Sequence, residues 1–184
     1  MSVENREFLQ EVMRKEIKDR KIPISLGKTC PVKCTFCYEM DHSYRQTFDM
    51  PLTTQEDWDF ILNEIIAFPT RATESWVLGG NEYMEWTDLA LHPKAMEWIE
   101  EFLEKTDKNI IMFSVGYFDP KKINRLAEKY PGRINFELSV ITLGAYRKQL
   151  MPKGPSVNQV LEVLDGPAVT SANFYSFGLG TMSE

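Results

Sequence analysis

The sequence predicts an α/β protein built around a parallel sheet of about five strands with helices packed against it. Segments with the apolar repeat of amphipathic helices alternate along the whole chain with short apolar runs typical of strands. Several of those runs are apolar on both faces, which is typical of parallel strands covered by helices. The length of 184 residues and the 43% hydrophobic content suit one globular domain.

The first expected element is an amphipathic helix over residues 2–19. Its apolar side carries Phe8, Leu9, Val12, Met13 and Ile17. An extended run over 22–27 follows and leads directly into a group of cysteines. We therefore divide the chain into an N-terminal helical extension, 1–20, and a core domain, 21–184.

Four further helices are expected from their start signals. These signals are a capping-box pair at Thr53 and Glu56, Pro93, the Asp119–Pro120 pair, and a second capping-box pair at Ser156 and Gln159. An apolar stripe at helical spacing follows each signal, as in Trp58, Ile61 and Ile65 after the first one. Each helix is expected to cover the sheet with that stripe.

Four apolar runs between these helices are expected to be strands: 75–78, 109–115, 134–141 and 168–176. The loop over 38–52 is long for such a fold, and long ordered loops are more often functional than purely connecting.

Composition narrows the function classes. The net charge of −6 gives no electrostatic basis for binding nucleic acid or an anionic membrane. No apolar stretch approaches the roughly 20 residues that span a bilayer, and the N-terminus lacks the apolar segment of a secretory signal. We expect a cytoplasmic protein whose cysteines serve metal or redox chemistry.

All three cysteines lie within eight residues, at Cys30, Cys34 and Cys37. Their C-x3-C-x2-C spacing, with the aromatic Phe36 just before the last cysteine, resembles the signature of the radical SAM enzymes. Short spacings let one loop wrap an iron–sulfur cluster through deprotonated cysteine sulfurs. The loop follows the first expected strand, so it should lie at the carboxyl end of the sheet, where α/β proteins build their sites.

The resemblance implies two cofactors, a [4Fe-4S] cluster and S-adenosylmethionine (SAM). The three thiolates would bind three irons and leave the fourth for SAM. One electron from the cluster then gives methionine and a 5′-deoxyadenosyl radical, which abstracts hydrogen from a substrate. Phe36 and Tyr38 take positions that in this family lie near the adenine.

A second resemblance lies at Gly79, Gly80, Asn81 and Glu82, which follow the second strand like the Gly-Gly-Glu motif of the family. Paired glycines let backbone approach a ligand closely, and a carboxylate suits the SAM ammonium. Asn81 stands where the family has its acid, so either Glu82 acts one residue later or Asn81 replaces it. Without the cysteines, the pair of glycines indicates only a turn.

The fourth strand resembles the family segment that offers polar groups to the ribose. Glu137 and Ser139 are two residues apart and share one face, which is either the interior of the site or an outward face under a helix. Arg147 follows at a distance where the family often has a base for the SAM carboxylate, and a solvated helix charge is the alternative. His92 precedes a proline and is expected to be a helix-entry residue.

Weaker candidates for the same cavity lie at later strand ends. They are Ser114, Tyr117, Asn173, Tyr175, Ser176 and the Gly178–Gly180 exit, which resembles the family segment that backs the adenine.

The resemblance implies a partial TIM-like (β/α) barrel. The family core usually has six strand–helix units, whereas the sequence shows about five. We therefore expect that the last unit is missing and that a further segment or a partner closes the barrel.

The expected function is radical SAM enzymology on a small-molecule substrate, with an electron donor such as a flavodoxin or ferredoxin. A competing hypothesis is a non-catalytic iron–sulfur or zinc protein, in which His42 completes a zinc site with the cysteines. The sequence is also compatible with unligated structural cysteines, and with a partner-dependent fragment of a larger radical SAM enzyme.

Overall fold

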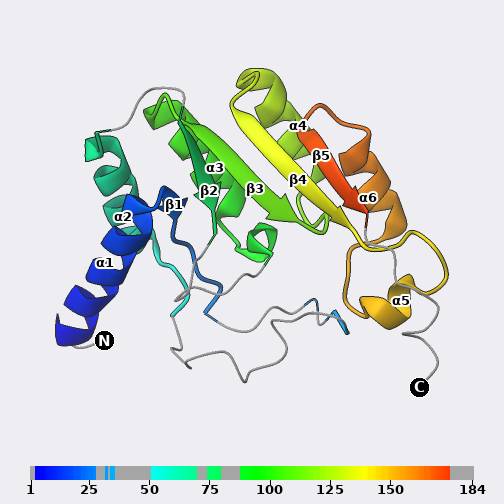
Figure 1. Cartoon of the computed structure of the whole chain (residues 1–184), viewed down its shortest axis with the longest axis horizontal. Helices are drawn as coiled ribbons and strands as arrows, with labels where there is room; N and C mark the ends of the chain where they lie inside the picture. The colour runs from blue at the N-terminus through cyan, green and yellow to red at the C-terminus, as the bar shows by residue number, and fades with distance from the viewer. Residues whose placement is uncertain are drawn as a thin grey trace.

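The computed structural model describes residues 3–27, 32, 34–35, 51–69, 74–79 and 88–174. Its centre is one parallel sheet in which the strand order follows the chain order, β1-β2-β3-β4-β5. The strands are β1 (Lys21–Ile22), β2 (Ser75–Leu78), β3 (Asn109–Ser114), β4 (Ile134–Val140) and β5 (Val169–Phe174). The predicted α/β class and parallel sheet are confirmed (Figure 1).

The described helices are α1 (Val3–Lys18), α2 (Gln55–Ala67), η3 (Leu89–Leu91), α3 (Ala95–Lys105), α4 (Pro120–Lys129), α5 (Arg147–Leu150) and α6 (Val157–Leu164). Each long helix contacts the next along the chain, α1 with α2, α2 with α3, α3 with α4 and α4 with α6. These helices therefore form one layer beside the sheet. The sheet is not closed into a barrel, because β1 and β5 are its edges.

The hydrophobic core lies between that helix layer and one face of the sheet. Phe136, Leu138 and Val140 of β4 are buried at alternate positions, and Phe136 meets Phe118 edge-on at 5.2 Å. The largest fully buried side chains include Trp58, Trp76, Trp98, Phe102, Phe118 and Phe136. Leu9, Met13 and Ile17 of α1 belong to the same core, so this helix packs on the domain.

The helix starts differ in detail from expectation. Thr54, not Thr53, is the N-cap of α2, and it forms the reciprocal capping box with Asp57. The expected Thr53–Glu56 pair is wrong because Thr53 is engaged with the segment after β1. Pro93 lies just before Lys94, the N-cap of α3, so it precedes the first turn. The Asp119 cap of α4 and the Ser156 cap of α6 are confirmed.

The strands agree with their expected positions, except that the first is short. Only Lys21 and Ile22 pair in β1, because Pro23 has no N–H to continue the ladder. No helix in the described ranges combines the length and the apolar character needed to cross a membrane.

Candidate functional site

The structure describes part of the predicted site: Cys34, Gly79, Glu137, Ser139 and Arg147. Outside the described residues lie Cys30, Phe36, Cys37, Tyr38, His42, Gly80, Asn81, Glu82, Tyr175, Ser176 and 178–180. The expected loop over 38–52 is described only at residues 51 and 52.

The described part of the cysteine motif lies at the carboxyl ends of β3 and β4. Val32, Ile141 and Met151 form a small buried cluster, the Val32 cluster, against which Cys34, Leu91, Val115, Tyr117 and Leu150 pack. The Thr35 N–H also donates to the Leu150 carbonyl over 2.9 Å. Cys34 therefore lies at the end of the sheet where the sequence places it.

Hydrogen bonds join the chain before the cysteine motif to the chain after it, at a place here called the base of the cysteine loop. The Ser25 N–H donates to Thr53 Oγ1 over 2.7 Å, and the Thr53 N–H donates back to the Ser25 carbonyl over 3.1 Å. Leu26 and Leu52 form an antiparallel bridge beside them. The chain just before the cysteine motif is thus held against residues 52 and 53 near the carboxyl end of β1.

Gly27 at this base tolerates no side chain. Its φ is +65°, and a Cβ would overlap the backbone nitrogen of Leu52. Gly132 has a similar φ of +74° with open space around it. We expect Gly132→Ala to cost about 1 kcal/mol of unfolding free energy from backbone strain alone.

For Gly27→Ala we expect the same strain plus an overlap cost of about 1–3 kcal/mol. Chemical denaturation of the two variants measures the difference. Equal losses would show that the base of the loop is not tightly packed.

Gly79 ends β2 in a conformation that side chains rarely adopt, with φ +126°. It is buried, and its N–H donates to the Ile22 carbonyl over 3.2 Å. The start of the predicted Gly-Gly segment is therefore held at the carboxyl end of β1.

Arg147 is buried, with 6% of its surface exposed, so the solvated helix charge is wrong. Its Nε and Nη2 donate to the Pro155 carbonyl at 3.1 and 3.0 Å, and its Nη1 donates to the Thr142 carbonyl at 2.8 Å. Burial lowers the pKa of this guanidinium, and the nearby Cys34 thiol and Tyr117 phenol partly oppose that shift. Leu150 and Met151, which follow Arg147 on the same turn, pack in one cluster with Cys34, so the structure brings Arg147 and Cys34 close to each other.

Glu137 and Ser139 lie on the face of β4 opposite the helix-packed Phe136 and Leu138. The outward position under a helix is therefore wrong. Glu137 pairs in register with Phe113 and Ser171, and Ser139 with Asn173, whose amide donates to the Glu137 carboxylate at 3.5 Å. This face of the sheet therefore carries polar side chains on the neighbouring strands β4 and β5, and those of β4 are half-buried.

Asp88 is a buried residue of the site that the sequence did not reveal. Its Oδ2 accepts from the Ser114 hydroxyl at 2.8 Å and the Val115 N–H at 2.9 Å, and Oδ1 accepts from the Ala90 N–H at 3.2 Å. Ser114 Oγ in turn accepts from the Gly116 and Tyr117 N–H groups. Asp88 therefore fixes the turn that leaves β3 and carries Tyr117. The only local signal was an acid before the Leu-Ala-Leu run, as an N-cap.

Burial raises the pKa of Asp88 to about 6, against the hydrogen bonds that lower it. The folded state binds this proton more tightly than the unfolded chain, whose Asp88 pKa is near 3.8. The Asp88 contribution to stability is therefore greatest at low pH and is lost as the pH rises through about 6.

When the pH is lowered from about 7.5 to about 4, we expect the free energy of unfolding of the wild type to rise by about 2 kcal/mol relative to that of Asp88→Asn. Denaturant titrations of both proteins at the two pH values measure this difference. Parallel pH profiles would contradict it.

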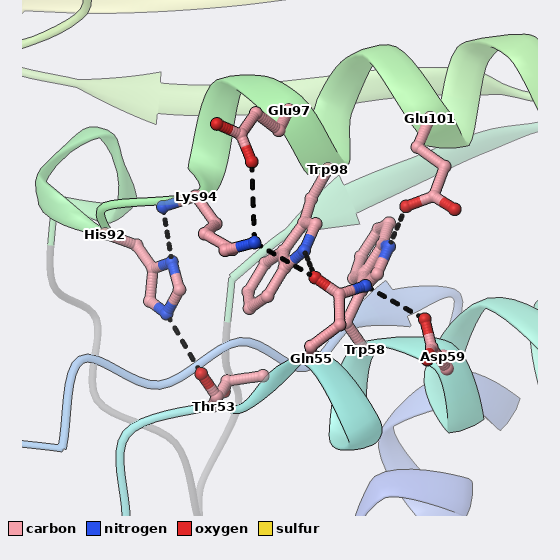
Figure 2. A network of polar contacts seen from close by, with 9 residues as sticks. All are labelled: Thr53, Gln55, Trp58, Asp59, His92, Lys94, Glu97, Trp98 and Glu101. Atoms are coloured by element: carbon pink, nitrogen blue, oxygen red, sulfur yellow. Dashed lines mark hydrogen bonds and ion pairs between the residues drawn. The ribbon is translucent and has the colours of Figure 1, made fainter.

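His92 is a helix-entry residue, as expected. Its Nδ1 accepts from the Lys94 N–H at 3.2 Å, so Nε2 carries the proton that is shared with the Thr53 carbonyl at 3.2 Å. Burial lowers the His92 pKa, which favours this neutral form. Figure 2 shows how the ring ties the entry of α3 to the base of the cysteine loop.

Within the described ranges, no three His, Cys, Asp or Glu side chains converge to hold a metal ion, and two of the three proposed ligands lie outside those ranges. Comparison with protein-family models, with curated proteins and with solved structures finds no match to this chain.

Proposed function

We propose that this protein is a radical SAM enzyme whose cluster ligands are Cys30, Cys34 and Cys37. The observation that carries the proposal is the placement of Cys34 at the carboxyl ends of β3 and β4, beside a buried arginine. The three-cysteine spacing supports the proposed chemistry, and the carboxyl ends of parallel strands are where α/β proteins build their sites.

The fold supports this proposal through its strand order. Five parallel strands pair in chain order and successive helices lie in one layer, and the strands of a (β/α) barrel also follow the chain order. We propose that the sheet is a partial TIM-like barrel and that the face turned away from the described helices, with Glu137 and Ser139, is the interior. A further segment or a partner would close it.

Cys34 and the described groups around it would suit one ligand position of an iron–sulfur centre. Sulfur donors suit iron–sulfur clusters, and a neighbouring cation such as Arg147 would compensate the negative charge of a cluster bound at Cys34. The apolar Val32 cluster shields this position from water on one side. A [4Fe-4S] cluster bound there would supply the electron that breaks the carbon–sulfur bond of SAM.

The other predicted residues would bind and orient SAM. Gly79 and Gly80 would bring backbone close to the methionine moiety, and Glu82 or Asn81 would accept from its ammonium. Glu137 and Ser139 would accept from the ribose hydroxyls, and Phe36 and Tyr38 would contact the adenine.

The proposed setting is the cytoplasm, with a flavodoxin or ferredoxin as electron donor. The proposed interior face, where the Asn173 amide donates to the Glu137 carboxylate, suits a small polar substrate.

Spectroscopy of the anaerobically reconstituted protein tests the proposal. We expect about four irons per chain and an electron paramagnetic resonance signal, after dithionite reduction, that changes when SAM is added. Bound zinc without iron would support a zinc protein. A cluster whose electron paramagnetic resonance signal does not change when SAM is added would support a non-catalytic iron–sulfur protein.

A further inference from the structure

Arg147 lies on a segment that packs against Cys34 and Thr35 of the cysteine motif. Residues 142–156, here called the strap, join β4 to α6 and contain α5. Leu150 and Met151 of the strap pack in the Val32 cluster with Cys34, and the Leu150 carbonyl receives the Thr35 N–H. The position of Cys34 therefore depends on the shape of the strap.

Arg147 joins the two ends of the strap, and its hydrogen bonds to them are here called the clamp. Its guanidinium donates to the Thr142 carbonyl at one end and to the Pro155 carbonyl at the other. A planar fork can bridge two carbonyls in this way, whereas a lysine ammonium cannot hold the same geometry.

The charge of Arg147 is not balanced by a carboxylate within the described part of the chain. Each of its described hydrogen bonds goes to a neutral carbonyl, and none of the described ion pairs includes it. A buried cation is costly unless a negative group compensates it. Cys34 and Tyr117 pack around the same Val32 cluster as Leu150, which lies on α5 with Arg147, so a cluster ligated by Cys34 would place negative charge near this guanidinium.

We propose that Arg147 is the built-in counter-charge of the anionic centre that Cys34 ligates, and that it raises the reduction potential of the proposed cluster. This inference rests on the proposed function, because it concerns the same site. A thiolate-ligated cluster is negative and becomes more negative on reduction, so a fixed cation beside it stabilises the reduced form. Arg147 is thus a positioning residue through its clamp and an electrostatic one through its charge.

A redox titration of the reconstituted protein without SAM, followed by electron paramagnetic resonance, tests this role. We expect the midpoint potential of Arg147→Gln to be more negative than that of the wild type. Arg147→Lys keeps the charge and loses the clamp, so its potential should stay near the wild-type value while its stability falls. Lys148→Gln, an exposed cation on the same helix, should leave the potential unchanged.

If Arg147→Gln does not fold, Leu150→Glu is the second variant, because it leaves the clamp and adds a carboxylate beside the Val32 cluster. It should also shift the potential to a more negative value. If Arg147→Gln folds and its cluster keeps the wild-type potential, the inference is overturned. Weaker SAM binding by that same variant would assign Arg147 to the SAM carboxylate instead.

The outcomes separate this inference from the proposed function. A shifted potential in a protein that does not cleave SAM supports the role of Arg147 and contradicts the proposed enzyme. A wild-type chain that takes up no iron contradicts both.

Discussion

Replacing Cys34 with alanine is expected to abolish iron loading and SAM cleavage. Three thiolates are the minimum set that leaves one iron open to SAM in the proposed site, so loss of one ligand removes the cluster itself. Iron and sulfide analysis of the reconstituted variant, with product analysis by chromatography, measures both effects.

Val32→Ala is the matched control, because Val32 is buried in the same cluster and has no ligand atom. It should lose about 1–2 kcal/mol of stability and keep its iron. SAM cleavage by Cys34→Ala at the wild-type rate would remove Cys34 from the ligand set.

Replacing Trp98 with alanine is expected to cost about 3–5 kcal/mol of unfolding free energy. The ring is 2% exposed and stacks on Trp58 with centroids 5.1 Å apart, and its Nε1 donates to Gln55 Oε1 over 3.1 Å. It also meets the His92 ring at 4.4 Å. Figure 2 shows these groups joining α2 to α3 beside Thr53. Denaturant unfolding measures the loss.

A pair of phenylalanine variants isolates the hydrogen bond. Trp98→Phe removes a satisfied N–H, whereas Trp76→Phe removes a buried N–H that has no acceptor within reach in the described structure. Trp98→Phe should therefore cost about 1 kcal/mol more than Trp76→Phe. Equal costs would show that the Gln55 contact does not stabilise the α2–α3 interface.

The fold was largely predictable because its signals are local. Apolar periodicity located α1, α3 and α4, and the Asp119 and Ser156 caps are set by side chains within three residues of their targets. The choice between Thr53 and Thr54 was not local. Both have a hydroxyl suited to an N-cap, and the pairing of Thr53 with Ser25, far away in the sequence, decides which one is available.

For the candidate site, only the location of Cys34 was predicted from the sequence and then confirmed, and the radical SAM chemistry stays a proposal. The cysteine spacing and the strand order place Cys34 at the carboxyl end of the sheet, and the structure agrees. The buried state of Arg147 depends on how the strap brings the Pro155 carbonyl back to the guanidinium, which no sequence periodicity predicts. Asp88 was missed because its main partner, Ser114, is at the end of β3, 26 residues further along the chain.

The most direct test of the radical SAM proposal is the formation of 5′-deoxyadenosine by the iron-loaded wild-type protein under anaerobic conditions. With SAM and dithionite present, we expect 5′-deoxyadenosine and methionine in equal amounts, and neither product when the reductant or the iron is left out. A fully loaded protein that leaves SAM intact under these conditions would contradict the proposed chemistry.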